Sequence, residues 1–190
     1  MSDVRWWLVL ALALAYGLYH PLNQRPSKYY WQWPIDLQLP LLPGWVWVYC
    51  TYFLMLPGSI ALTWWSPVSQ NLLTSLLIAK AISLPIWFFW PNGVKRPKIE
   101  KPSNSSERLL ALIYKHDGDT NGCPSSHVFT SLIGSWYLAG AFPQLTILFL
   151  GWGVLISIST VLTKQHYVVD VICGFALACL SIYLVGLLHF

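Results

Sequence analysis

The sequence predicts an all-α membrane protein, because its composition suits a lipid solvent and its apolar stretches have the length of membrane spans. Hydrophobic residues make up 56% of the 190 residues, charged residues only 9%, and the mean hydropathy is +0.53. A soluble domain carries about 25% charged residues. The 12 Trp and 10 Tyr are typical of side chains that collect at the headgroup level of a bilayer. These values disfavour a soluble helical bundle.

Six stretches are apolar enough to cross a bilayer core of about 30 Å, which takes roughly 20 residues of helix. The first stretch follows Arg5 and lacks a small-residue cleavage site, so a retained helix is favoured over a signal peptide. We therefore expect a single domain over residues 1–190, with spans at about 5–21, 44–64, 71–90, 125–142, 145–163 and 167–188.

The connections between these spans differ in length and polarity. Those after the second and fourth spans are short and uncharged, whereas those after the first and third spans are long. The segment at about 22–43 contains a Tyr-Tyr-Trp-Gln-Trp-Pro run, which indicates an aromatic stretch in the membrane interface. The segment at about 91–124 is predicted to be a polar loop.

Counting membrane crossings assigns most of the positive charge to one side of the membrane. The connections after spans one, three and five share a face, called face A here, and both termini lie on the opposite face with Arg5. Lys80 lies in the middle of the third span, where a charge is costly. The sequence leaves open whether Lys80 reaches the interface, pairs inside the bundle or contacts a substrate. Face A collects the other basic residues, namely Arg25, Lys28, Lys95, Arg96, Lys98, Lys101, Arg108, Lys115 and Lys164.

Four groups of residues whose side chains suit catalysis or phosphate binding also fall on face A. The two spans between His127 and His166 return the chain to this face, so the two histidines are expected to lie close together. The groups are Lys95-Arg96-Pro97, Cys123-Pro124-Ser125-Ser126-His127, Thr163-Lys164-Gln165-His166-Tyr167, and Asp170.

This arrangement favours phosphate chemistry at a histidine. His166 and Asp170 are one helical turn apart and share one face of a helix. The carboxylate can accept a hydrogen bond from one ring nitrogen, which leaves the other nitrogen free to attack. Pro124 and two serines open the fourth span, where N-capping and free backbone N–H groups favour a bound phosphate.

The order Arg-Pro, Pro-Ser-x-His and His-x-x-x-Asp resembles the three-part signature of the type 2 phosphatidic acid phosphatase superfamily. That superfamily includes membrane lipid phosphatases, lipid phosphotransferases and soluble vanadate haloperoxidases. The resemblance covers about residues 85–180. It implies that His166 is the nucleophile that forms a phosphohistidine, that Asp170 orients it, and that His127 protonates the leaving alcohol. It also implies that no metal or cofactor is needed, and that phosphate is bound by Arg96, Ser125 and Ser126.

Two cations of that signature are absent. The lysine expected seven positions before the signature arginine is Phe89 here, and Ser159-Thr160 stands where an arginine is expected before the nucleophilic histidine. Lys95 and Lys164 are candidates to supply the missing charge. Ser126 takes the place of the signature glycine.

The lead prediction is a membrane lipid phosphate phosphatase, a metal-independent hydrolase of phosphate or diphosphate esters. A lipid phosphotransferase of the sphingomyelin or inositol phosphorylceramide synthase type shares the first half-reaction and stays open as an alternative. Because two signature cations are absent, a third interpretation stays open, namely a catalytically silent membrane protein that binds lipid phosphates. No nucleic acid partner is expected, and the sequence determines neither the lipid nor the oligomeric state.

The membrane orientation follows from two arguments that disagree. The positive-inside rule puts face A in the cytoplasm, whereas the resemblance favours an extracytoplasmic site. Since a phosphate site needs cations on whichever side it lies, the charge count partly reflects function. We therefore expect face A to be extracytoplasmic.

Overall fold

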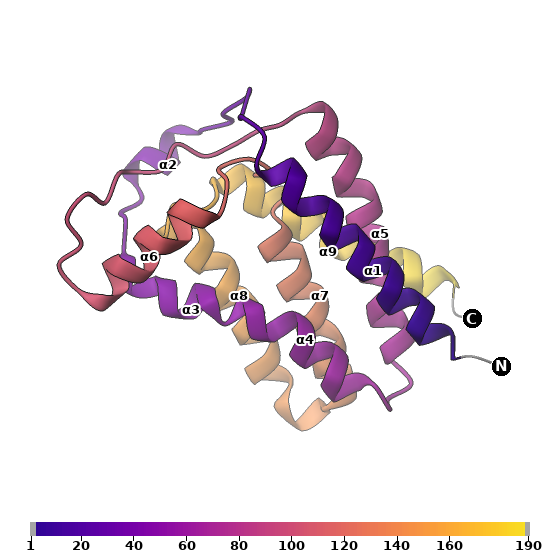
Figure 1. The fold of residues 1–190 in the computed structure, drawn as a ribbon. Coiled ribbons are helices and arrows are strands. Elements are labelled where there is room, and N and C mark those ends of the chain that lie inside the picture. The colour runs from indigo at the N-terminus through magenta and orange to yellow at the C-terminus, as the bar shows by residue number, and fades with distance from the viewer. Residues whose placement is uncertain (1–2, 189–190) are drawn as a thin grey trace.

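The computed structural model describes residues 3–188, which form a bundle of α-helices (Figure 1). The all-α prediction is confirmed, since this part of the chain contains no β-strand and only two isolated bridges between connecting segments. The helices are α1 (Val4–Asn23), α2 (Pro34–Gln38), α3 (Val46–Cys50), α4 (Tyr52–Thr63), α5 (Ser69–Phe89), α6 (Ser105–His116), α7 (Ser126–Ala141), α8 (Thr146–Leu162) and α9 (Val168–Leu188), with single 3-10 turns at Pro43–Trp45 and Pro143–Leu145.

Four segments of the described chain are long and apolar enough to cross a membrane. They are Pro43–Thr63, Ser69–Phe89, Pro143–Leu162 and Val168–Leu188, which match the second, third, fifth and sixth predicted spans. The first and fourth predicted spans form α1 and α7, but neither helix meets the same criteria. The chain is thus an integral membrane protein by these helices, and the count of six spans stays a prediction.

The outer surface of the bundle is apolar, as expected for helices in lipid. Large apolar side chains on α1, α8 and α9 are exposed, among them Leu14 (64%), Ile147 (90%) and Phe175 (57%). In water such an exposed apolar surface would mark an interaction site. Here it is distributed around the bundle and suits contact with acyl chains.

Helix α7 is the central helix, because it packs against α4, α5, α8 and α9. Most of its residues are buried, including three serines and one threonine. Glycines on its neighbours allow the close packing. A methyl group on Gly174 of α9 would lie 2.9 Å from the carbonyl oxygen of Ser125, and one on Gly153 of α8 would overlap the side chain of Ser135. Protein, rather than lipid, therefore surrounds α7, which explains how it can be short and rich in hydroxyl groups.

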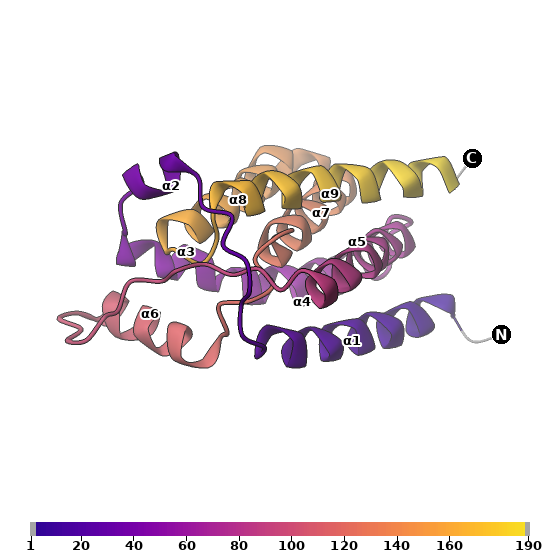
Figure 2. The ribbon, with the colours of Figure 1, turned by 90° about the horizontal axis from the view of Figure 1, so that it is seen from above.

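The face-A connections cover one end of the bundle. Helices α2 and α6 lie at that end, away from the first turn of α1 and the last turn of α9 (Figures 1 and 2). Figure 2 also shows α1 and α6 on one side of the molecule and α8 and α9 on the other. Both ends of the described chain thus lie at the end of the bundle opposite the face-A connections.

The segment at 91–124, predicted as a polar loop, contains the 12-residue helix α6. Its start is capped by side chains. The Asn104 side chain accepts a hydrogen bond from the Glu107 N–H at 2.9 Å, and the Glu107 carboxylate accepts one from the Ser103 N–H at 2.7 Å. Helix α6 has one apolar face, which packs on α3 and the preceding 3-10 turn.

Candidate active site

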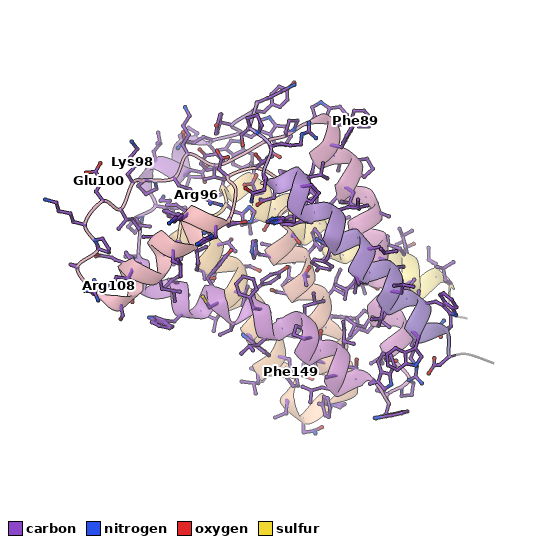
Figure 3. The ribbon with its side chains drawn as sticks, in the orientation of Figure 1. Phe89, Arg96, Lys98, Glu100, Arg108 and Phe149 are labelled. Carbon is purple, nitrogen blue, oxygen red and sulfur yellow. The ribbon has the colours of Figure 1, made fainter. Side chains whose placement is uncertain are left out.

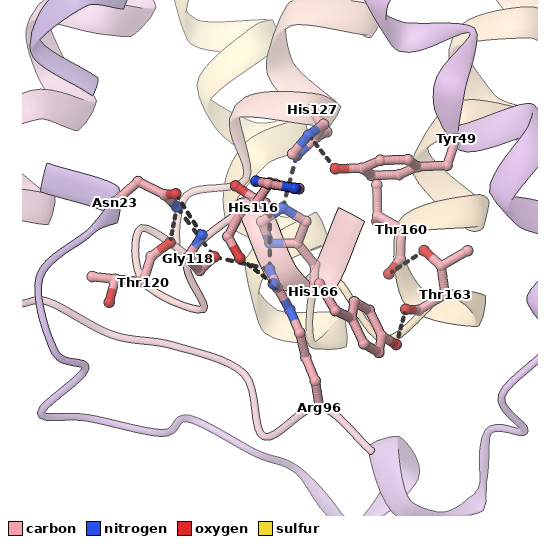
Figure 4. A network of polar contacts seen from close by, with 12 residues as sticks. Asn23, Tyr49, Arg96, His116, Gly118, Thr120, His127, Thr160, Thr163 and His166 are labelled. Atoms are coloured by element: carbon pink, nitrogen blue, oxygen red, sulfur yellow. Dashed lines mark hydrogen bonds and ion pairs between the residues drawn. The ribbon is translucent and has the colours of Figure 1, made fainter. Parts of the chain in front are cut away.

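The histidines and the aspartate singled out in the sequence meet at the face-A end of the bundle, where Figure 4 shows the two histidines. His127 lies in the first turn of α7, His166 lies just before α9, and Asp170 lies in the first turn of α9. His127 Nδ1 is 3.0 Å from His166 Nε2, and His166 Nδ1 is 3.4 Å from Asp170 Oδ2. The three residues are 7%, 5% and 0% exposed. The tight turn between α7 and α8 brings them together, as the sequence predicted.

A fourth residue, Tyr49 of α3, extends this row, because its hydroxyl lies 2.8 Å from His127 Nε2. An ionised Asp170 only accepts hydrogen bonds, so His166 donates from Nδ1 and accepts at Nε2. His127 then donates from Nδ1 and accepts at Nε2, and Tyr49 donates its hydroxyl proton. With both histidines neutral, the contacts thus fix one direction of donation, from Tyr49 through His127 and His166 to Asp170.

The Asp170 carboxylate is held in place by backbone groups of both motifs. Its Oδ2 accepts a hydrogen bond from the Tyr167 N–H at 2.9 Å, and its own carbonyl oxygen accepts one from the Ser125 N–H at 3.1 Å. A methyl group on Gly122 would lie 3.1 Å from Oδ2 and 3.0 Å from Asn92 Nδ2. The loop before α7 therefore packs directly on the carboxylate, and a side chain at position 122 would push against Asp170 and Asn92.

Arg96 fixes the loop that precedes α7 (Figure 4). Its guanidinium donates to the Asp117 carbonyl at 2.7 Å, to Asp117 Oδ2 at 3.0 Å and to the Gly118 carbonyl at 3.0 Å. Burial raises the pKa of the Asp117 carboxyl, and the guanidinium opposes that shift. Only Nε of Arg96 is buried without a partner. In this state Arg96 is thus occupied mainly by protein carbonyl and carboxylate oxygens.

Lys164 is also occupied by protein oxygens. Its Nζ donates to the carbonyls of Asp36 at 2.9 Å and Leu39 at 2.6 Å, both in or next to α2. The Asp36 carboxylate in turn accepts hydrogen bonds from the Trp33 N–H at 2.7 Å and from the Val168 N–H at 2.8 Å. These contacts anchor the interfacial segment onto the turn between α8 and α9, and they hold His166 at the start of α9.

The remaining residues predicted to bind phosphate fall in two places. Lys95 is exposed, with its ammonium 5.3 Å from the centre of the Tyr30 ring. It lines a cavity of about 370 Å³ together with Arg96 and Lys164, on the outer side of the α8–α9 turn. The two serines lie at the start of α7. Ser125 is the N-cap, and the Ser126 hydroxyl accepts a hydrogen bond from Lys80 Nζ at 2.8 Å.

A cavity of about 420 Å³ opens beside His127. Its walls are formed by residues of α1, α3, α4, α6 and α7. Ring faces and apolar side chains form most of the wall. The lining residues are Tyr16, Tyr19, Tyr49, Tyr52, Phe53, Leu56, Pro57, Ile113, His116, Asp117, Ser126 and His127.

Helix α6 is tied to the histidine-bearing turn by Tyr114, whose hydroxyl donates to the Thr163 carbonyl at 2.6 Å. Burial raises the pKa of Tyr114 to about 12, so the phenol keeps its proton at neutral pH and the bond persists. In the described part of the chain no group of three or more His, Cys, Asp and Glu side chains is arranged to hold a metal ion.

Sequence reasoning missed the roles of Tyr49 and Asp36. Tyr49 is one of many aromatic residues at the edge of a span, and nothing in the pattern distinguishes it. Asp36 is the lone acidic residue in the aromatic segment 22–43. A single carboxylate in an apolar interfacial stretch is a signal that such a residue has buried partners.

The fold and the site together define a class, a helical membrane protein with a buried histidine pair and aspartate at one end of the bundle. A family model described as PAP2 superfamily matches residues 5–190, and the chain belongs to this superfamily. The resemblance seen in the three motifs is therefore confirmed, and membership indicates phosphatase or related phosphotransferase activity. Neither the comparison with curated proteins nor the comparison with solved structures gave a significant match.

Proposed function

We propose that this protein is a membrane lipid phosphate phosphatase that works through a phosphohistidine at His166. The observation that carries the proposal is the ordered row of hydrogen bonds from Tyr49 through His127 and His166 to Asp170. It presents His166 Nε2 as an unprotonated nitrogen and places a ring N–H of His127 directly against it. A nucleophile and a general acid therefore stand side by side in a buried site.

The first half-reaction forms a bond between His166 Nε2 and phosphorus and breaks the bond between phosphorus and the lipid oxygen. A phosphate ester that binds as the monoanion gives its proton to His127 Nε2, and the Tyr49 hydroxyl turns to accept a hydrogen bond there. The resulting imidazolium gives its Nδ1 proton to the leaving oxygen and becomes neutral. Asp170 accepts the hydrogen bond from Nδ1 of His166 and offsets the positive charge that develops on the ring. The distance of 3.4 Å in the free protein exceeds the usual range of about 2.7–3.2 Å, and such contacts tighten when substrate binds.

The second half-reaction reverses these roles. The Nδ1 nitrogen of His127, now without its proton, takes a proton from water, whose oxygen attacks phosphorus and breaks the bond to His166. Inorganic phosphate leaves with the proton of His127 Nε2, so both histidines return to their neutral starting state. A lipid alcohol in place of water gives a phosphotransferase instead.

Substrate entry requires one local rearrangement. His166 Nε2 accepts a hydrogen bond from His127 at 3.0 Å in the free protein, so phosphorus cannot reach that nitrogen until the two rings separate. We place the lipid part of the substrate in the aromatic cavity beside His127, because that cavity opens between two helices that contact lipid. We also propose that face A, and with it the site, is extracytoplasmic.

Phosphate release by purified protein in detergent tests the proposal. The assay takes a panel of lipid monophosphates and diphosphates, with a chelator present, and compares the wild type with His166→Ala. His20→Ala is a matched control, because His20 is an exposed histidine outside the cavity. We expect chelator-resistant release by the wild type and the control, and none by His166→Ala.

Adding diacylglycerol or a ceramide-like alcohol to the same assay separates hydrolysis from transfer. A new lipid phosphodiester formed at the expense of free phosphate supports the phosphotransferase alternative. If the wild type binds lipid phosphates but yields neither product above the His166→Ala background, the catalytic proposal fails and a silent binding protein is the better reading.

A further inference from the structure

Lys80 is a fully buried lysine whose ammonium has no carboxylate partner among the residues that the structure describes. It lies in the middle of α5 and is 0% exposed. Its Nζ donates one hydrogen bond, to the Ser126 hydroxyl at 2.8 Å. The ion pairs found among residues 3–188 do not include it. A buried charge without a counter-ion is costly, and a side chain of this kind inside a membrane segment points to function.

Aromatic rings form the rest of its surroundings. The ammonium lies 3.8 Å from the centre of the Tyr16 ring, 4.8 Å from Tyr19, 5.1 Å from Trp87 and 5.3 Å from Phe129. Ring faces attract a cation but accept N–H bonds only weakly. An ammonium has three N–H donors, and Ser126 accepts one of them. Two donors are therefore without an oxygen acceptor in the described chain.

This ammonium stands next to the reacting groups. Ser126 immediately precedes His127 and lines the 420 Å³ cavity together with Tyr16 and Tyr19. Backbone N–H groups of residues 126 and 127 belong to the first turn of α7, where N–H groups have no partner within the helix. The ammonium lies behind Ser126, which lines one wall of the cavity beside the first N–H groups of α7. Together these groups suit an anion with several oxygens.

In this chain the signature lysine of the superfamily is replaced by a residue that points away from this wall of the cavity. Phe89 takes the place of this lysine, at the end of α5, with a side chain that is 65% exposed (Figure 3). Lys80 lies about two and a half helical turns deeper on the same helix. Arg96 and Lys164 donate to protein carbonyl oxygens instead.

We infer that Lys80 is a phosphate-binding residue of this protein. Its two remaining N–H donors, together with the Ser126 hydroxyl and the first N–H groups of α7, bind the oxygens of a phosphate monoester that do not link it to the lipid. The charge of the phosphate offsets the buried ammonium. The inference rests on the proposed function, because the bound phosphate is the group that His166 attacks.

The test measures binding of inorganic phosphate, and separately of orthovanadate, to the purified full-length protein. Ligand-induced stabilisation in a thermal unfolding assay gives the affinity. Lys80→Met keeps the length of the side chain and removes the charge. We expect Lys80→Met to unfold at the same temperature as the wild type or higher, yet to bind phosphate at least about tenfold more weakly. Lys98→Met is the matched control, because Lys98 is an exposed lysine on face A (Figure 3).

The outcomes separate this inference from the proposed function. Phosphate binding that depends on Lys80 in a protein without turnover refutes the proposed reaction and leaves the binding role intact. Equal phosphate affinity and equal kcat/KM for Lys80→Met and Lys98→Met, in an active enzyme, overturn the role of Lys80. If Lys80→Met does not fold, Lys80→Gln is measured in its place, because it removes the charge but keeps a polar group that can bond to Ser126. Unchanged phosphate affinity in that variant overturns the inference.

Discussion

At the scale of single residues, the hydrogen bonds of His127 determine which of its ring nitrogens carries a proton in the free protein. Both ring nitrogens of His127 make hydrogen bonds, one to Tyr49 and one to His166, so one tautomer of the ring is favoured. Tyr52 packs on the same ring, with centroids 4.4 Å apart, but makes no hydrogen bond to it. Substitutions of Tyr49 and Tyr52 can therefore separate the effect of the hydrogen bond to His127 from the effect of packing on its ring.

Replacing Tyr49 by Phe is expected to lower kcat by about fivefold with little change in KM. The ring remains, but His127 Nε2 loses its donor, a loss of about 1 kcal/mol that lets the other tautomer form. Steady-state kinetics over a range of pH measure the effect, because altered proton placement also moves the pH profile. Tyr52→Phe is the control. An equal loss in both variants assigns the effect to packing.

At the scale of elements, short segments that are not themselves membrane spans hold the site together. Helix α2 is held by Asp36 and Lys164 on the turn that carries His166. Helix α6 is held by Tyr114 on the same turn. The turn that carries His166 is therefore held from outside the bundle as well as by α7.

Asp36→Ala is expected to loosen the first of these clamps. It removes the acceptor for two backbone N–H groups, one of them at the start of α9, and a hydrogen bond to a charged group contributes about 2 kcal/mol. We expect a lower melting temperature in detergent and lower kcat/KM. Glu100→Ala, at an exposed acid on the same face, serves as the reference. A melting temperature equal to that reference contradicts the clamp.

Gly174→Ala is expected to separate the two histidines. The new methyl group would lie 2.9 Å from both the Ser125 carbonyl oxygen and Val128 Cβ, so α9 has to move away from α7. Overpacking of this kind costs about 1–3 kcal/mol, and a shift of about 1 Å in an active site lowers the rate on the order of a hundredfold.

Gly186 on the same helix supplies the matched control for this substitution, because a methyl group there meets nothing within 4 Å. Gly186→Ala should be neutral or stabilising by up to about 1 kcal/mol through helix propensity. Melting temperature and phosphate release are measured for both variants. Wild-type activity in Gly174→Ala refutes the requirement for close packing between α7 and α9.

At the scale of the whole molecule, orientation in the membrane determines which compartment supplies the substrate. The native Cys123 is a poor reporter, because it is 5% exposed and burial raises the pKa of its thiol. Exposed positions at the two ends of the bundle serve better. Glu100 lies on face A, and Gln144 lies in the turn between α7 and α8 at the opposite end.

In a variant without native cysteines, Glu100→Cys is expected to react with a membrane-impermeant maleimide in intact cells. Gln144→Cys should react only after the cells are permeabilised. Labelling measured by a gel shift checks both. The reverse pattern places face A, and the active site, in the cytoplasm.

The sequence by itself determined that this protein lies in a membrane, that its fold is all-α, and that His127, His166 and Asp170 lie close together. A lipid solvent forces backbone polar groups to pair within helices, so apolar stretches predict helices reliably. His166 and Asp170 are one helical turn apart, and two spans return the chain from His127 to His166. The proximity of these three residues is therefore dictated by local geometry.

Only the tertiary structure decided which polar groups serve the site and which serve the fold. Lys164 and Arg96 look like phosphate ligands in the sequence, yet they donate to protein oxygens here. Lys80 and Tyr49 lie far from the motifs along the chain and reach the first turn of α7 through helix packing. The physical reason is that the partners of a buried polar group are set by contacts between helices, which spacing along the chain does not encode.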